Sequence, residues 1–397
     1  MTSLGDSAIM ARVRTWQIAE LVLLLVPGIL LLWRIRLCGD AETARPDGRA
    51  TAPSRVPAPS RATFTVVIPA RNEALRIAPL LSTLGAQTVR PNEVIVVDDG
   101  STDATAGMAA GAGCRVIPAP MRPPGWLGKT WASWTGAREA TGELLLFLDA
   151  DTRLDPRGCE RILRERARYG GVITLQPWHQ TGSFRERLSS FFNVVVMAAI
   201  NTFTAFGDAL APAGCFGPCI LCAREEYFRA GGHEAVKGSI LEDVDLGRRF
   251  LASGIPVRCL GGEGVIVFRM YPGGLGAIVE GWSKNIARGA QGSHPLVLAC
   301  MVLWISGCFS AAVFAARWGL SGSAAAAAES ALLYLLYAAE VLWMVRRVGN
   351  FGVLTALSYP AHLLFFVFVF ARSLFLTLIV RAVTWSGRRI ARPTRAG

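Results

Sequence analysis

Two carboxylates one residue apart, Asp149 and Asp151, follow the apolar stretch 143–148. Carboxylates at this spacing can bind one divalent cation from a turn, and hard oxygen ligands suit Mg²⁺ or Mn²⁺. A cation held there would neutralise charge on a departing nucleotide diphosphate. Asp-x-Asp triplets are otherwise common in solvated or capping loops, so the metal interpretation depends on the neighbouring motifs.

A second group of acids, Asp98 and Asp99, follows the β-branched stretch 93–97. Their carboxylates can accept hydrogen bonds from a uracil N–H or from ribose hydroxyls. The alternative is a helix cap by Ser101 or Asp103 in the same motif. Lys129 follows Gly128 and could contact a diphosphate as a point charge, although a single lysine after glycine is usually a solvated loop residue.

Three further acids, Glu242, Asp243 and Asp245, stand at a predicted helix start. Acids in a first helical turn ordinarily complement the helix dipole. One of them could instead be the general base that deprotonates an acceptor. Trp282 and Lys284 precede a long apolar segment. They could close over a donor and its phosphates, or they could form an interfacial belt with a snorkelling lysine.

The elements that position these residues alternate along the chain. Short strands are predicted at 64–68, 93–97 and 143–148, with helical stretches between them. This order predicts a mostly parallel sheet flanked by helices, with right-handed crossovers. Ligands of such sheets bind at the carboxyl ends of the strands. The polar motifs, including 69–73 after the first strand, stand at those ends.

Apolar residues are concentrated at the two ends of the 397-residue chain, which is 52% hydrophobic with a mean hydropathy of +0.38. Segment 16–33 is long enough to span a bilayer and is expected to be an anchor rather than a cleaved signal peptide. Three later spans are expected at 296–316, 324–345 and 353–380, and an interfacial helix at 188–206. The predicted organisation is an anchor (1–36), a linker (37–62), a catalytic domain (63–294), membrane helices (295–381) and a basic tail (382–397).

The net charge of +12 comes largely from arginines beside apolar stretches, which suit anionic lipid headgroups. Because no separate basic domain exists, nucleic-acid binding is not expected. The nine scattered cysteines argue against a disulfide framework. Cys215, Cys219 and Cys222 have a spacing used for iron–sulfur clusters, but small buried hydrophobes are the favoured interpretation.

Membrane orientation is only partly fixed by the sequence. A cytosolic nucleotide-sugar donor would need a catalytic domain that faces the cytoplasm. Three later spans would then put the arginine-rich tail outside, against the positive-inside tendency. Pro360 could break or lay flat the last segment, which would remove the conflict.

Together these motifs resemble glycosyltransferase family 2, which has the GT-A fold. The resemblance covers about residues 64–292 and depends on four motifs in order: Val-Ile-Pro-Ala-Arg-Asn-Glu, Val-Asp-Asp-Gly-Ser-Thr-Asp, Asp-x-Asp and Glu-Asp. It implies a metal pair at Asp149 and Asp151, and a base at Asp243 with Glu242 second. The nucleotide pocket that it implies is lined by Pro69, Asn72, Glu73, Asp98 and Asp99.

A closer likeness is to the carotenoid glycosyltransferases that act on diaponeurosporenoate-type acids. It depends on the motifs at 176–179, 216–218, 231–233, 268–271 and 280–284, and it extends nearly to the end of the chain. Those enzymes resemble this chain in having one amino-terminal and several carboxyl-terminal spans. The likeness implies transfer of glucose from UDP-glucose to a carotenoid carboxylate. Hopanoid-associated glycosyltransferases are a more distant match.

Two departures qualify what the resemblance implies: the motif at 280–284 differs from that of processive enzymes, and the carotenoid enzymes need not carry Asp beside the Glu of the acidic pair, as Asp243 stands beside Glu242 here. Processive polysaccharide synthases carry Gln-x-x-Arg-Trp, whereas the comparable place here reads Glu-Gly-Trp-Ser-Lys at 280–284, which favours a single transfer. A carboxylic-acid acceptor is already ionised near neutral pH, so a general base is not required. We therefore expect an inverting, metal-dependent hexosyltransferase that uses a UDP-sugar and a membrane-dissolved lipid. The alternatives are another glycolipid or polysaccharide acceptor, or a non-catalytic membrane scaffold.

Overall fold

The computed structural model describes residues 2–39, 62–289, 292–377, 382–385 and 388–391. The chain packs as two units. The first consists of Met1–Arg34, Ser183–Leu210 and Gly273–Gly397, and the second of Ile35–Gly182 and Ala211–Pro272. The expected catalytic stretch 63–294 therefore includes two segments that pack in the first unit. Most of the expected linker 37–62 and the end of the basic tail lie outside the described residues.

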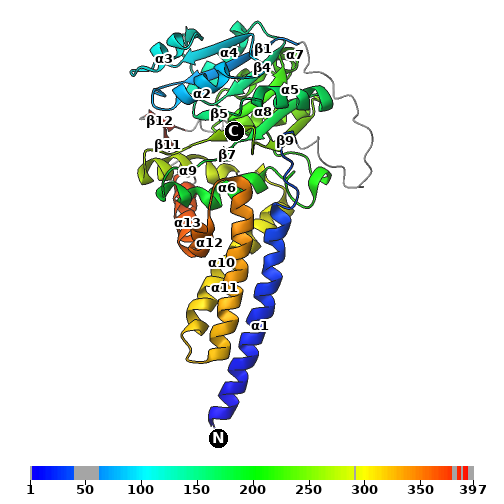
Figure 1. Cartoon of the computed structure of the whole chain (residues 1–397), viewed down its shortest axis with the longest axis vertical. Coiled ribbons are helices and arrows are strands. Elements are labelled where there is room, and N and C mark those ends of the chain that lie inside the picture. Colours follow the sequence, from blue (N-terminus) through cyan, green and yellow to red (C-terminus); the bar gives the residue numbers. More distant parts are fainter. Residues whose placement is uncertain (1, 40–61, 290–291, 378–381, 386–387, 392–397) are drawn as a thin grey trace, which may run out of the picture. The chain divides into compact units, whose positions relative to one another are not determined.

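The second unit is built around a seven-stranded sheet (Figure 1). Its strand order is β3-β2-β1-β4-β8-β6-β9. Only β8, among the strands of this sheet, runs antiparallel to its neighbours. The strands are β1 (Phe64–Ala70), β2 (Glu93–Asp98), β3 (Arg115–Pro118), β4 (Leu144–Leu148), β6 (Val172–Gln176), β8 (Cys219–Ala223) and β9 (Val257–Gly261).

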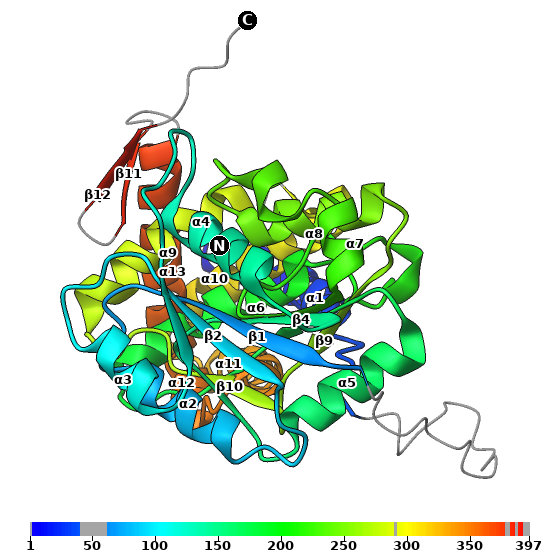
Figure 2. The same ribbon diagram turned by 90° about the horizontal axis from the view of Figure 1, so that it is seen from above.

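The predicted parallel sheet is confirmed, and the three predicted strands are β1, β2 and β4, which lie side by side (Figure 2). Val67 pairs with Ile95 on one side and with Phe147 on the other. All five residues of β4 are buried, as expected for a strand covered on both faces. The carboxyl ends of the three strands therefore lie at one edge.

Helices connect the strands and cover the sheet. A second, three-stranded sheet follows the carboxyl end of β4 in the order β5-β10-β7. Its strands are β5 (Thr152–Leu154), β7 (Trp178–His179) and β10 (Ile266–Phe268). The helices are α2 (Ile77–Gly85), α3 (Thr105–Gly111), α4 (Gly128–Glu139), α5 (Gly158–Tyr169), α7 (Arg224–Arg229), α8 (Glu242–Ala252) and the 3₁₀ turn η4 (Gly232–Val236).

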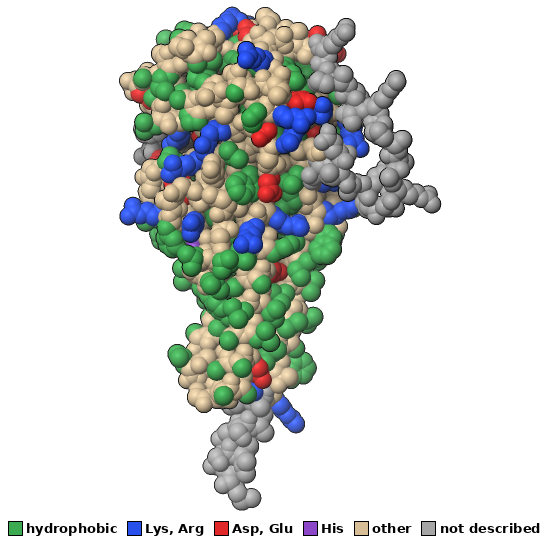
Figure 3. All heavy atoms as spheres, in the orientation of Figure 1, with side chains coloured by type: hydrophobic (Ala, Val, Ile, Leu, Met, Phe, Trp, Pro, Cys, Tyr) green, Lys and Arg blue, Asp and Glu red, His purple; other side chains and the backbone are tan. Residues whose placement is uncertain are grey.

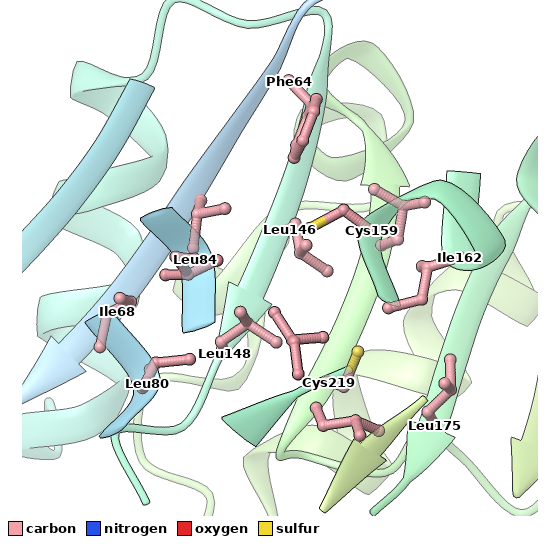
Figure 4. Close-up of a cluster of buried hydrophobic side chains, with 14 of the residues drawn as sticks. Phe64, Ile68, Leu80, Leu84, Leu146, Leu148, Cys159, Ile162, Leu175 and Cys219 are labelled. Carbon is pink, nitrogen blue, oxygen red and sulfur yellow. The ribbon is translucent and has the colours of Figure 1, made fainter. Parts of the chain in front are cut away.

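The hydrophobic core of this unit lies between the sheet and the helices α2 and α5 (Figure 4). Ile68 and Leu146 of the sheet are almost completely buried, as are Leu80 of α2 and Ile162 of α5. A buried side chain of this size stabilises the fold by about 1.5–3 kcal/mol. The core thus fixes the ends of β1 and β4, where the acidic motifs begin.

The first unit is mostly helical. Its long helices α1 (Thr2–Leu31), α10 (Pro295–Gly319) and α11 (Ala324–Val348) lie side by side (Figure 1). Two side chains of α11 donate hydrogen bonds to this part of the chain: Tyr337 to the carbonyl of Leu21 in α1, and Arg347 to the carbonyl of Leu32 just after it. The other elements are η2 (Arg185–Ser189), α6 (Ser190–Ala199), η3 (Gly207–Ala209), α9 (Leu275–Gly289), α12 (Val353–Leu357), α13 (Tyr359–Phe375), β11 (Ala382–Trp385) and β12 (Arg388–Ala391).

Three described helices are long and apolar enough to cross a membrane, namely residues Arg12–Leu31, Pro295–Gly319 and Ala324–Val348. Hydrophobic side chains gather on their outer faces (Figure 3), where Leu23 is 70% and Leu332 is 60% exposed. The fourth expected span is divided into α12 and α13, with Pro360 in the first turn of the 17-residue α13. Proline suits that position because its missing N–H would have no partner there.

Candidate functional site

The Asp149–Asp151 turn lies at the carboxyl end of β4, as the sequence predicts. The Asp149 N–H donates to the carbonyl of Pro218 (3.1 Å). The Asp149 carbonyl accepts from the N–H (3.2 Å) and the hydroxyl (2.8 Å) of Thr152. Ala150 between the two acids is buried. The turn is thus fixed by its backbone, and its two carboxylates are left to contact other groups.

Lys129, in the first turn of α4, meets these acids. Its Nζ atom lies 2.8 Å from Asp149 Oδ1 and 3.4 Å from Glu242 Oε1. Burial lowers the pKa of Lys129, but the carboxylates of Asp149, Glu242 and Asp243 more than offset this and raise it above its usual value. Lys129 is therefore a fixed positive charge that joins two of the predicted motifs.

Even with this lysine, negative charge accumulates around Asp151. Burial, and then the carboxylates of Asp149 and Glu73, raise the pKa of Asp151 to about 7. Burial also raises the pKa of Glu73, which forms an ion pair with Arg76 at 3.5 Å. An excess of clustered carboxylates fits a divalent cation. Within the described ranges, however, no group of three or more His, Cys, Asp or Glu is arranged as a complete metal site. The residues present are a partial ligand set.

Asp243, in the first turn of α8, is held by backbone N–H groups. Its carboxylate accepts from Gly217 (2.9 Å) and from Val244 (2.9 Å). A side chain at Gly217 would place its Cβ 2.6 Å from Asp243 Oδ2, so glycine allows this approach. Burial, and then the charge of Glu242, raise the pKa of Asp243 to about 6. Two backbone N–H groups thus hold the Asp243 carboxylate in place.

The third acid, Asp245, has a local role. Its carboxylate accepts from the Ser239 hydroxyl (2.6 Å) and forms an ion pair with Arg248 (3.1 Å). The Ser239 hydroxyl in turn accepts from the N–H of Leu241. Asp245 therefore stabilises the start of α8.

The loops after β1 and β2 hold each other in place. Asn72 has a left-handed backbone (φ 54°). Its N–H donates to the Ser101 hydroxyl (3.0 Å), and its side-chain oxygen accepts from the N–H of Thr102 (2.8 Å). Asp98 accepts from the N–H and hydroxyl of Ser101. Asn72 therefore joins the loop after β1 to the loop after β2, and Asp98 holds Ser101 within its own loop.

Asp99 follows the carboxyl end of β2, and its side chain is partly exposed there. It forms an ion pair with Arg71 at 3.5 Å, and its side chain is 17% exposed. A Cβ at Gly128 would lie 2.4 Å from Asp99 Oδ2, so glycine lets the start of α4 approach this carboxylate. The sequence offers Ser101 or Asp103 as the cap of the helix after β2. In the structure α3 begins after Ala104 without a side-chain cap, and the Asp103 carboxylate accepts from the N–H groups of Thr105 and Ala74.

A small cavity joins several of the predicted residues. The structure brings Pro69, Lys129, Asp149, Glu242 and Asp243 into its lining. The sequence predicts no chemical role for the other lining residues, although Gly217 and His233 belong to the motifs 216–218 and 231–233 that carry the closer likeness. The signal that could have found one of them is the Gly-Gly pair before His233, since paired glycines indicate a tight turn. The residues not predicted are Ser133, Phe147, Leu148, Gly217, Ile220 and His233.

Trp282 and Lys284 belong to α9 of the first unit. The Trp282 ring stacks on Phe192 with centroids 4.9 Å apart, and its indole N–H lies 3.3 Å from the Ser189 hydroxyl. Trp282 is 6% exposed. It thus has packing partners within its own unit. The side chain of Lys284 lies outside the described residues.

The cysteine trio supports the interpretation as buried hydrophobes. Cys215, Cys219 and Cys222 are buried and free, and all nine cysteines lack disulfides. Cys219 and Cys222 belong to β8 and pair with Leu148 and Leu145 of β4. Burial raises the pKa of all three thiols, which opposes the thiolate form that a metal requires.

The fold and these motifs have counterparts in known proteins. A mannosyltransferase from Pyrobaculum calidifontis, PcManGT, solved with GDP-Man and Mn²⁺, superposes with a TM-score of 0.56 at 19% identity, over 93% of this chain and 99% of that chain. Identity this low establishes the fold alone. A model of Glycosyl transferase family 2 matches residues 65–228, and a relative is 33% identical over 82% of the chain. The chain therefore belongs to glycosyltransferase family 2 and is a glycosyltransferase with the GT-A fold.

The relative is the 4,4'-diaponeurosporenoate glycosyltransferase of Staphylococcus aureus (strain USA300). The similarity spans 330 residues and covers 88% of that protein. The proteins of strains NCTC 8325 and Newman match equally. The similarity therefore extends well beyond the 164 residues of the family match, 65–228.

Proposed function

We propose that the protein transfers a hexose, glucose being the expected one, from a UDP-sugar to a carotenoid carboxylic acid or a related terpenoid lipid. The reaction is metal-dependent and inverts the anomeric centre. The observation that carries the proposal is the cluster of Asp149, Lys129, Glu242 and Asp243 at the carboxyl ends of the sheet, with Asp151 near enough for the charge of Asp149 to raise its pKa. The acceptor class rests on the S. aureus relative, which is named for a carotenoid acid.

On the donor side, Asp149 and Asp151 would bind a Mg²⁺ or Mn²⁺ ion. When bound, this ion supplies positive charge to the departing diphosphate, whose oxygens would complete the partial ligand set. The mannosyltransferase of similar fold was solved with Mn²⁺ and a nucleotide sugar, which agrees with this role. Lys129 would contribute a second positive charge, because its ammonium lies within 3.4 Å of both acidic motifs.

The nucleotide would occupy the loops after β1 and β2. Pro69, Glu73 and Asp99 would line its pocket, while Asp98 and Asn72 would hold the two loops in shape. Their contacts with Ser101 and Thr102 support this division of roles. A carboxylate such as Asp99 can accept hydrogen bonds from the base or the ribose.

On the acceptor side, an ionised carboxylate would attack the anomeric carbon. A bond forms between the carboxylate oxygen and that carbon, the bond from the carbon to the diphosphate oxygen breaks, and UDP leaves with the electron pair. No proton has to be removed from the acceptor. Asp243, with Glu242 beside it, would then orient the sugar or stabilise developing charge. For an alcohol acceptor Asp243 would be the general base.

The membrane helices would bring the site to an acceptor that does not leave the bilayer. Three described helices have the required length and apolarity. We propose a multi-pass protein whose catalytic unit faces the cytoplasm, where UDP-sugars are made. The donor contacts expected for Trp282 and Lys284 stay a prediction, since Trp282 packs on Phe192 within its own unit and the Lys284 side chain lies outside the described residues.

The test is product analysis with purified protein in detergent or vesicles. The protein is supplied with UDP-glucose, Mn²⁺ or Mg²⁺ and an apocarotenoid carboxylic acid, and products are identified by mass spectrometry. We expect one hexose added through an ester bond. Long polymers would indicate a polysaccharide synthase, and transfer only to alcohol-bearing lipids would replace the acceptor class. Absence of UDP binding in calorimetry would overturn the transferase proposal itself.

A further inference from the structure

His233 is a buried side chain that lines the cavity but has no part in the chemistry above. It is 3% exposed and shares the cavity with Lys129, Asp149 and Asp243. Its ring packs edge-on against Phe147, with centroids 5.2 Å apart. A buried imidazole facing a site of this kind has a donor or an acceptor to offer, and its tautomer decides which.

The tautomer follows from the hydrogen bonds of Tyr227. The backbone N–H of His233 donates to the Tyr227 hydroxyl at 3.0 Å, so that oxygen acts as an acceptor. The same oxygen lies 2.9 Å from His233 Nδ1. Tyr227 is completely buried, and among the described residues Nδ1 is the acceptor within reach of its hydroxyl proton. Tyr227 therefore donates to Nδ1, and the ring proton of His233 lies on Nε2.

Two glycines make this contact possible. Gly231 and Gly232 both have left-handed backbones, with φ of 84° and 50°. A Cβ at Gly232 would lie 2.6 Å from the Tyr227 ring and 2.8 Å from the Trp134 ring. The Gly-Gly-His sequence therefore turns the chain tightly enough to seat the imidazole between Tyr227 and the cavity.

The imidazole is neutral. Burial, and then the charge of Lys129, lower the pKa of His233 to about 3. His233 thus contributes an uncharged N–H donor to a cavity whose charged groups are the carboxylates of Asp149, Glu242 and Asp243 and the ammonium of Lys129, with the Ser133 hydroxyl also in the lining.

We propose that His233, locked by Tyr227 as the Nε2–H tautomer, donates a hydrogen bond to one hydroxyl of the transferred sugar and so determines which hexose is accepted. The proposal rests on the proposed function. A hydroxyl suits these surroundings because its oxygen can accept from Nε2–H while its proton goes to a carboxylate. An anionic group would be repelled by the three carboxylates and would gain little from a neutral donor.

The test compares UDP-glucose with its analogues that each lack one hydroxyl of the hexose. Wild-type protein should discriminate against one of these analogues by about 10- to 100-fold in kcat/KM, since one buried donor is left unpaired. In His233→Phe this discrimination should vanish for that analogue, while discrimination against the others and the affinity for UDP stay the same. Tyr227→Phe keeps the imidazole but frees its tautomer, and should lose part of the same discrimination.

The control is His294→Phe, which changes a histidine at the start of α10 in the other unit. It should retain the wild-type pattern. If His233→Phe slows every donor alike and keeps the discrimination, or if Tyr227→Phe leaves it untouched, the inference is wrong although the transferase function stands. If wild-type protein transfers no sugar from any UDP donor, the proposed function fails and the inference fails with it.

Discussion

Replacing Lys129 by methionine should change metal binding and catalysis in opposite directions. The Lys129 ammonium lies 2.8 Å from an oxygen of Asp149, a proposed metal ligand. Coulomb's law gives about 1.5 kcal/mol for this distance in water and about 6 kcal/mol at an effective dielectric constant of 20. Because the Lys129 side chain is 33% exposed and that of Asp149 27%, the lower value applies. Removing the lysine should therefore tighten Mn²⁺ binding about ten-fold in the absence of nucleotide.

Catalysis should fall in the same variant, because the diphosphate loses a fixed positive charge. Loss of one such electrostatic contact lowers kcat by about 10²–10³-fold. Calorimetric titration with Mn²⁺ measures the first effect, and release of UDP from UDP-glucose measures the second. Lys237→Met is the matched control, since the Lys237 side chain is exposed, and it should leave both unchanged. Weaker Mn²⁺ binding in Lys129→Met would refute competition for Asp149.

Two more predictions concern Asp243. Gly217→Ala would bring a Cβ within 2.6 Å of its carboxylate, so kcat should fall at least ten-fold. Gly85→Ala, with open space around it, should retain full activity in the same assay. The raised pKa of Asp243, about 6, predicts a pH effect on stability in chelator. Between about pH 4 and 6 the native state binds more protons than the unfolded chain, so the melting temperature should fall as pH rises. Asp243→Asn should weaken this fall; an unchanged slope would contradict the assignment.

Much of the sheet can be predicted because its strands are short, β-branched and buried on both faces. β1 and β2 extend the predicted stretches by two residues and one residue, and β4 begins one residue later than predicted. A buried strand after the Gly-Pro turn is expected from the apolar residues at 219–223, but the antiparallel direction of β8 is not. Strand direction depends on partners distant in the chain, which one sequence does not show.

The acidic motifs of the site could be predicted because strand ends in a parallel sheet converge. The pairing between these motifs could not be predicted, because Lys129 contacts both Asp149 and Glu242, and Glu242 lies 113 positions further along the chain than Lys129. The role of Asp98 in its own loop also needed the structure, because capping and ligand binding use the same residue types. The Gly-Gly pair before His233 indicates a tight turn, but the contact of His233 with the cavity needed the structure.

The membrane segments illustrate the limit of composition. Their apolar runs predict α1, α10 and α11 because each is long and uninterrupted. The last run is interrupted between Leu357 and Tyr359, and the Ser358 hydroxyl donates to the Leu354 carbonyl there. Helix 190–199, expected to be interfacial, is instead largely buried in its unit. Hydropathy alone does not distinguish lipid-facing from protein-facing residues.

The central claim is that Asp149 and Asp151 hold the metal ion used in sugar transfer. Measuring transfer by the Asp151→Asn variant, with and without metal, tests it most directly. Asparagine has the same size but removes one carboxylate from the cluster at the end of β4. Wild-type protein with UDP-glucose and an apocarotenoid acid should form the hexosyl ester with Mn²⁺ and lose this activity in chelator. The variant should fall about 10²-fold or more at any Mn²⁺ concentration while retaining the wild-type melting temperature in chelator or exceeding it. Undiminished transfer by the variant, or full wild-type activity in chelator, would contradict the account.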